Sequence, residues 1–235
     1  MFENLSLLSF ASGGWGSALL AGALVTIVLA LSCLPIGLPL GLGVALAARS
    51  RRRWLRSLST VFATVFRGLP ELLTLLIIYY GCQIGAQKLL AAMGYEAEVA
   101  INPFVAAMIA FSLVFAAFSS QIWLGAFKTV PKGQFEAAAA LGLSRRTTFT
   151  KVVLPQLVRI ALPGLSNNWL SLLKDTSLAS IIGYVDLTKA AQIVNNREIR
   201  PFELYLFIAV IYWLCSYGMS RYARTLEQRL APGAT

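Results

Sequence analysis

The chain has 235 residues, of which 57% are hydrophobic and 13% are charged, and its formal net charge is +10. Soluble domains usually carry about 25% charged residues, so this composition indicates a membrane protein; residues 1–235 are expected to form a single transmembrane domain with no length left for a second catalytic module. The basic residues gather in short loops beside apolar stretches, which argues against a nucleic-acid partner.

The residue types that usually carry catalysis or metal binding are scarce. The chain has no histidine, and its three cysteines all lie within apolar stretches. This pattern argues against a disulfide framework, a zinc site and a Ser/His/Asp or Cys/His catalytic set. A GxxxxGK[ST] loop, which would cradle the phosphates of ATP, is also missing from the sequence. We therefore expect no catalytic residue, no metal and no bound cofactor on this chain.

Five apolar stretches are each long enough for a helix to cross the hydrocarbon layer, which takes about 20 residues. Pro35 and Pro39 predict a kink in the first stretch, and Gly37 and Gly41 form a GxxxG spacing that would let another helix approach closely. The expected fold is an all-α membrane protein of about five transmembrane helices, at residues 18–48, 58–90, 103–127, 162–184 and 203–224.

The basic residues are distributed unevenly between the two sides of these spans. Fourteen arginine and lysine residues lie in the segments 49–56, 128–159 and 221–229. Because the spans alternate in direction, these three segments share one side of the membrane. The loops of the other side hold only four, at Lys88, Lys189, Arg197 and Arg200. Because cytoplasmic loops carry the excess of basic residues, the N-terminus is expected in the periplasm and the C-terminus in the cytoplasm.

The segment 136–155, EAAAALGLSRRTTFTKVVLP, is a basic and soluble-looking insertion between two spans. Pro131 suits a first helical turn, and the Glu-Ala run that follows is made of strong helix formers. Gly142 can end that helix in the left-handed conformation, and Ser144 can cap a second helix running toward Pro155, where it must stop or kink. The result is an elbow of two short helices. A chain does not need such an elbow to span a bilayer. It is therefore expected to dock a cytoplasmic partner.

This elbow resembles the EAA loop of ABC-importer permease subunits at every anchor, with Val152 in the usual Ile position. The stretches FRGLPELLTLLIIYYG (66–81), GAFKTVPKGQFEAA (125–138) and LPGLSNNWLSLLKDTSL (162–178) extend the likeness over nearly the whole chain. Together they are similar to the polar amino-acid uptake permeases, of the histidine/lysine/arginine/ornithine and opine type. The resemblance implies a type I ABC-importer permease fold in the bacterial inner membrane.

In that family the elbow, at about 131–160 here, is a coupling helix that fits a cleft on the ATP-hydrolysing subunit. The resemblance therefore implies two ATPase subunits, which would hold ATP and Mg²⁺, and a periplasmic substrate-binding protein. It also implies a second permease subunit, in a heterodimer rather than a homodimer. The residues that carry over to ATPase coupling are Glu136, Ala137, Ala138, Gly142, Arg145 and Pro155.

Polar side chains inside the spans are the expected substrate contacts, because charges there are costly and usually functional. A cationic amino acid needs acceptors for its ammonium and side-chain charge and a donor for its carboxylate. Glu71 is the first candidate acid, and Asn167 with Asn168 would be neutral contacts. The full set of candidates is Arg67, Glu71, Asn167, Asn168 and Asp175.

Other interpretations stay open at this stage. Arg67 could be cytoplasmic or simply neutralise Glu71, and Lys174 with Asp175 could be a structural ion pair. An ion-driven secondary transporter is the first alternative function, although such proteins are expected to have more spans and often internal repeats. A non-transporting membrane scaffold is the second.

Overall fold

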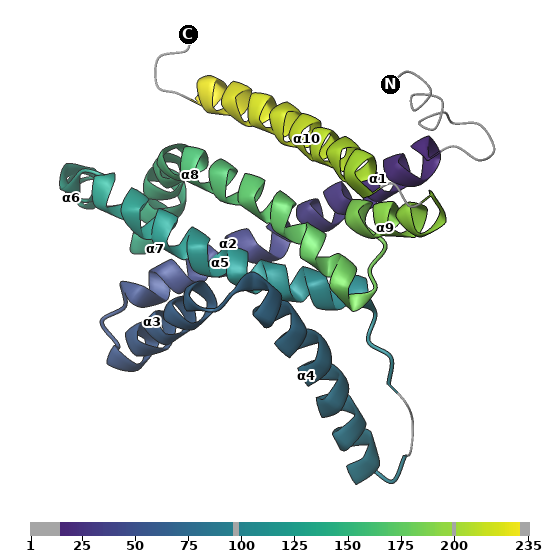
Figure 1. Cartoon of the computed structure of the whole chain (residues 1–235). Coiled ribbons are helices and arrows are strands. Elements are labelled where there is room, and N and C mark those ends of the chain that lie inside the picture. Colours follow the sequence, from purple (N-terminus) through teal and green to yellow (C-terminus); the bar gives the residue numbers. More distant parts are fainter. Residues whose placement is uncertain (1–14, 96–98, 199–200, 231–235) are drawn as a thin grey trace.

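The computed structural model describes residues 15–95, 99–198 and 201–230, and the elements in these ranges are helices (Figure 1). The first predicted span consists of α1 (Gly16–Ser32) and α2 (Leu34–Ala48), joined end to end. The winding is interrupted at Cys33, and Pro35 lies in the first turn of α2 while Pro39 lies inside it. The proline ring removes a backbone donor and crowds the preceding turn, so the kink appears where the prolines predicted it.

The second predicted span, 58–90, is two helices and not one. They are α3 (Arg53–Gly68) and α4 (Glu71–Ala92), and between them Leu69 and Pro70 have extended backbones. A residue before proline is disfavoured in the helical region, which explains why the break falls there. In Figure 1, α4 projects away from the remaining helices, and only Thr74 and Leu75 of it are buried.

The central element is α5 (Pro103–Thr129), which follows the cap residue Asn102 and buries fourteen residues. The Asn102 side chain accepts a hydrogen bond from the Phe104 amide at 2.9 Å and caps the helix. Its bounds agree with the third predicted span, 103–127.

The most extensive helix–helix contact in the described chain is that of α2 with α5. A methyl group on Gly37 would lie 2.6 Å from the Phe115 ring. On Gly41 it would lie 2.9 Å from the Ser119 Cβ and 3.0 Å from the carbonyl oxygen of Ala116. The GxxxG spacing therefore does admit a second helix, and α5 is that helix.

The second half of the elbow and the fourth predicted span form one continuous path of helix. The elbow holds two short helices and a turn of π-helix, and α8 follows directly at Leu154. Span four thus starts eight residues before the predicted 162, because Pro155 lies in the first turn of α8 and Pro163 is accommodated inside it. The elements are α6 (Lys132–Ala140), α7 (Arg145–Thr147), η2 (Thr148–Val153), α8 (Leu154–Asp175) and the 3₁₀-helix η3 (Thr176–Ile182).

The chain continues with α9 (Leu187–Glu198) and α10 (Pro201–Leu230), and α10 lies along α8 and α9. Four helical stretches of the described chain are long and apolar enough to cross a membrane: Gly16–Ala48, Glu71–Ala92, Pro103–Thr129 and Pro201–Arg229. The fourth predicted span is not among them, because its polar residues lower its hydropathy. It packs instead against α5 and α10.

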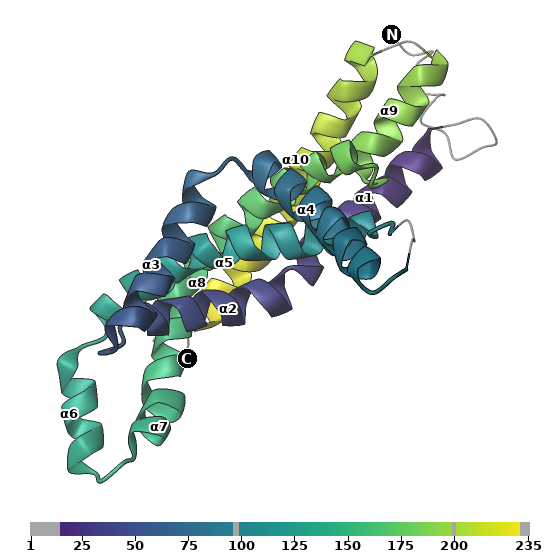
Figure 2. The ribbon, with the colours of Figure 1, turned by 90° about the horizontal axis from the view of Figure 1, so that it is seen from below.

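The basic segments gather at one end of the molecule. In both Figure 1 and Figure 2, the elbow, the α2–α3 loop and the end of α10 lie toward one end, and the start of α1 and α9 lie toward the other. The uneven charge of the loops therefore corresponds to a real polarity of the fold.

A fully buried carboxyl group lies at the start of α9. Asp186 accepts a hydrogen bond from the Lys189 amide at 2.8 Å, and the Leu187 amide donates to the Thr26 hydroxyl of α1 at 3.2 Å. Burial raises the pKa of Asp186 to about 6. This capping arrangement joins the start of α9 to Thr26 of α1.

Gly41→Ala is expected to destabilise the protein by about 1–3 kcal/mol, because the added methyl group meets α5 and the backbone must move apart. Gly43→Ala is the matched control on the same helix, since nothing lies within 4 Å of a methyl group there. Thermal unfolding in detergent measures both, and equal melting temperatures for the two variants would contradict the close-packing account.

The stability of the protein is expected to fall as pH rises from 3.8 toward 6. The unfolded Asp186 carboxyl loses its proton before the folded one does, so the protonated native form is favoured only at low pH. A shift of this size corresponds to at most about 3 kcal/mol.

Asp186→Asn keeps the capping oxygen but cannot ionise, so it should flatten this part of the pH dependence. Melting temperatures of both proteins at pH values below and above this window test the assignment. An unchanged pH dependence in the variant would show that Asp186 is not the responsible group.

Candidate functional site

A polar cavity lies where the end of α3, the start of α4, α5 and α8 meet. Its volume is about 500 Å³. All five residues that the sequence predicted as substrate contacts line this one cavity, although they come from distant parts of the chain. The lining consists of Arg67, Glu71, Val114, Phe115, Phe118, Gln121, Ile122, Gly164, Asn167, Asn168, Ser171, Leu172 and Asp175.

The α3–α4 break places two opposite charges on the wall of the cavity. Arg67 lies in the last turn of α3 and Glu71 in the first turn of α4, so each helix dipole stabilises its charge. The Arg67 guanidinium lies 5.6 Å from the centroid of the Phe118 ring, a cation–π distance. Within the described part of the chain, no ion pair ties Arg67 to Glu71. The described structure therefore does not pair Arg67 with Glu71.

The α8 wall presents a polar stripe at helical spacing. Asn167, Ser171 and Asp175 recur every four residues and line the cavity together. Lys174 is exposed and is not part of the lining. Asn168 has a second role, because its amide nitrogen donates to the Phe115 carbonyl at 3.3 Å and to the Ser119 hydroxyl at 3.1 Å. Asn168 thus holds α8 against α5.

Sequence reasoning did not select the α5 wall. Gln121 and Phe118 line the cavity, and Gln121 is the one amide side chain in the apolar span 103–127. A polar side chain in such a span was the available signal for Gln121. Nothing in the sequence distinguishes Phe118 from other apolar residues. Gly164 lets α8 approach, since a methyl group there would lie 2.8 Å from Ile122.

A second, smaller polar hollow continues from the first. It has a volume of about 260 Å³ and shares Arg67 and Gln121 with the main cavity. Its other polar groups are hydroxyl-bearing side chains from α3 and α5, at Ser59, Thr60, Thr64 and Ser120. The two hollows therefore adjoin each other at Arg67 and Gln121.

The turn between the two short helices of the elbow has the local structure that its sequence predicted, whereas the second helix does not stop at Pro155 but runs through η2 into α8. The Leu143 amide donates to the Ala138 carbonyl and the Gly142 amide to the Ala139 carbonyl, both at 3.0 Å, and Gly142 has a φ of 70°. This is the Schellman ending, in which glycine takes the left-handed position. Ser144 then caps α7 by accepting from the Thr147 amide at 3.2 Å.

The elbow is attached firmly to the helices that form the cavity. The rings of Phe127 at the end of α5 and Phe149 in η2 stack with centroids 6.4 Å apart. Arg49 lies 4.5 Å from the centroid of the Phe127 ring. Gln156 of α8 donates to the Gln134 side chain of α6 at 3.2 Å. A displacement of the elbow must therefore reach α5 and α8.

Most of the predicted coupling residues lie on the elbow surface. Glu136, Ala137, Gly142 and Arg145 are exposed, whereas Ala138 is buried. Arg145 also lines a hollow of about 460 Å³ between the elbow and the ends of α2 and α5. Pro155, the remaining predicted member, is exposed in the first turn of α8. Among the described residues, no group of three or more cysteine, aspartate or glutamate side chains gathers as metal ligands would.

Membrane-crossing helices, a polar cavity between them and a helical elbow at one end define a subunit of a membrane transport system. Residues 37–232 match the family described as the binding-protein-dependent transport system inner membrane component, and the chain belongs to this family.

Two curated relatives are permease subunits of amino-acid importers. The chain is 35% identical over 220 residues to the histidine/lysine/arginine/ornithine transport system permease protein HisQ of Escherichia coli (strain K12), covering 94% of this chain and 96% of the relative. It is 41% identical over 213 residues to the arginine ABC transporter permease protein ArtQ of Haemophilus influenzae, covering 91% and 93%.

A solved structure, described as the crystal structure of an amino acid ABC transporter with histidines, has the same fold. It superposes with a TM-score of 0.77 at 30% identity, and the match covers 92% of this chain and 95% of the other. The protein is thus a multi-pass permease subunit of an ABC importer in the bacterial inner membrane. The interpretations as an ion-driven transporter or a scaffold are not favoured.

Proposed function

We propose that this chain is the membrane subunit through which an ATP-driven importer takes up cationic amino acids such as arginine, histidine, lysine or ornithine. The observation that carries the proposal is the charge of the cavity, which holds two carboxyl groups and one guanidinium among neutral polar groups. An amino acid with a cationic side chain has two positive groups and one negative group, so its charges complement those of the wall.

Each polar residue of the cavity has a role in this proposal. Glu71 and Asp175 accept hydrogen bonds from the ammonium and the side-chain cation of the substrate. Arg67 donates a bidentate pair to its carboxylate, and Asn167 supplies a neutral contact. The low dielectric of the membrane interior strengthens these contacts and makes an unpaired charge costly, so a neutral amino acid is disfavoured.

The proposed topology has five spans, with the N-terminus in the periplasm and the C-terminus in the cytoplasm. We also propose that residues 1–235 are one permease domain. The crossing that is added to the four apolar helices is made by α8 and η3, and Asn167, Ser171 and Asp175 of α8 line the cavity. The gathering of the basic segments at the elbow end supports this orientation (Figures 1 and 2).

The proposed partners are two ATPase subunits, a second permease subunit and a periplasmic substrate-binding protein. ATP and Mg²⁺ would be held by the ATPase subunits, and this chain would hydrolyse no ATP and hold no cofactor. The projecting α4, almost unburied in the described chain, offers a face for the second permease subunit, in a heterodimer.

Coupling would run from the ATPase subunits through the elbow to the cavity. The contact of Phe149 with Phe127 carries a displacement into α5, and the unbroken path from η2 into α8 carries it into the opposite wall. Because both walls move, nucleotide binding can bias the cavity between outward and inward access. The hydroxyl-lined hollow beyond Arg67 would be the cytoplasmic part of the route.

Glu136→Lys is expected to reduce uptake about tenfold or more while the subunit still inserts, because a reversed charge at a docking surface repels its partner. Proteoliposomes with the ATPase subunits and the binding protein measure uptake and ATP hydrolysis together. Glu227→Lys is the control, since it makes the same charge change on α10, outside the elbow. Normal uptake by the Glu136 variant would refute the docking role.

Glu71→Gln is expected to lower uptake of arginine about tenfold, because a charge-assisted hydrogen bond is lost. Uptake of a neutral amino acid should fall much less. Competition uptake with labelled arginine and a neutral amino acid measures the ratio, and Asn167→Ala is the control that removes a neutral contact in the same cavity. Equal losses for both amino acids would remove Glu71 as the partner of the cation.

A further inference from the structure

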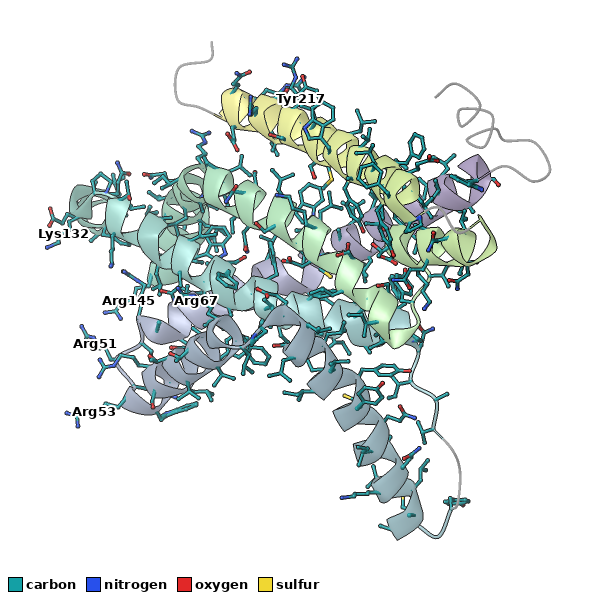
Figure 3. The ribbon with its side chains drawn as sticks, viewed as in Figure 1. Arg51, Arg53, Arg67, Lys132, Arg145 and Tyr217 are labelled. Atoms are coloured by element: carbon teal, nitrogen blue, oxygen red, sulfur yellow. The ribbon has the colours of Figure 1, made fainter. Side chains whose placement is uncertain are left out.

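The loop between α2 and α3 and the first turn of α3 form a strongly basic surface. Arg49, Arg51, Arg52, Arg53 and Arg56 lie within eight residues, and residues 4–70 contain no aspartate or glutamate. All five are exposed, and Arg49 also lies over the Phe127 ring. Figure 3 shows Arg51 and Arg53 reaching away from the helices at the elbow end. This charge has no counterpart on its own segment.

Two of these arginines belong to a hollow on the surface of α3. Arg53 and Arg56 are three residues apart and therefore share a helix face. Together with Ser57, Thr60 and Val61 they line a hollow of about 440 Å³. Two guanidinium groups beside two hydroxyl-bearing side chains are donors suited to a phosphate group.

The same helix carries an apolar stripe that continues from this hollow. Trp54, Leu58, Val61 and Val65 are 60%, 61%, 55% and 44% exposed, and their spacing of four, three and four places them on one face. The opposite face packs through the buried Ser59 and Ala63 against the helices α2 and α5. Val61 belongs to both the hollow and the stripe.

A single ligand that fits both parts has an anionic head and a long apolar tail. We propose that the α2–α3 loop and the exposed face of α3 form a binding site for an anionic phospholipid of the cytoplasmic leaflet. This site is independent of the cargo that the importer carries. The phosphate group lies between Arg53 and Arg56, and an acyl chain follows Leu58, Val61 and Val65 along α3. Basic clusters directly cytoplasmic of a membrane helix attract anionic lipid, and tryptophan favours the same interfacial level.

The test uses the purified full-length chain in phosphatidylcholine nanodiscs that contain a minor fraction of phosphatidylglycerol. Native mass spectrometry counts the phosphatidylglycerol molecules retained, and brominated phosphatidylglycerol should quench Trp54 fluorescence. The double variant Arg53→Gln, Arg56→Gln is expected to lower the preference for phosphatidylglycerol about thirtyfold.

The matched control is Arg221→Gln, Arg224→Gln, which removes two exposed arginines with the same spacing from α10. It should leave the preference unchanged. An equal loss in this control would mean that surface charge in general attracts the lipid, and would overturn the site.

Two further outcomes would overturn the proposal by naming another ligand. Displacement of phosphatidylglycerol by inorganic phosphate would mean that the hollow binds phosphate without a tail. Loss of ATPase subunits from the Arg53/Arg56 variant in detergent without anionic lipid would mean that the surface is a protein interface. Retained ATPase subunits together with lost lipid preference support the lipid site.

Discussion

The close approach of α2 to α5 is the contact on which the remaining arrangement depends. Helices in a membrane gain little from hydrophobic burial against each other, so close packing of small residues must hold them together. Gly37 and Gly41 bring the α2 backbone against Phe115 and Ser119 of α5 at distances that no side chain would allow. This contact fixes the position of α5, and the cavity and the elbow are both built against α5.

On its other side α5 is joined to α8 by a second close contact. Ile122 packs against Gly164, and the Asn168 side chain donates hydrogen bonds to the Phe115 carbonyl and the Ser119 hydroxyl of α5. The polar cavity therefore lies between α5 and α8, whose separation these contacts set, and the α3–α4 break forms its third wall.

Much of the candidate site could be predicted from the sequence, because each polar group in an apolar span is expensive and stands out. Glu71, Asn167 and Asp175 were found in this way, and one cavity contains them all. Gln121 gave the same kind of signal but was passed over. Phe118 gave none, because its place on the wall depends on how α5 is rotated against α8. The structural role of Asn168 likewise depends on a partner about fifty residues away.

The sequence by itself determined the elbow, the sidedness of the basic segments and the kinks, because capping residues, prolines and charge placement act over a few neighbouring residues. Only the tertiary structure decided that Arg67 lies over the Phe118 ring and forms no ion pair with Glu71. It also decided that α8 begins at Leu154 and runs through Pro163. These outcomes depend on contacts between distant helices, whose separation is set by the small residues at their crossings and not by any local pattern.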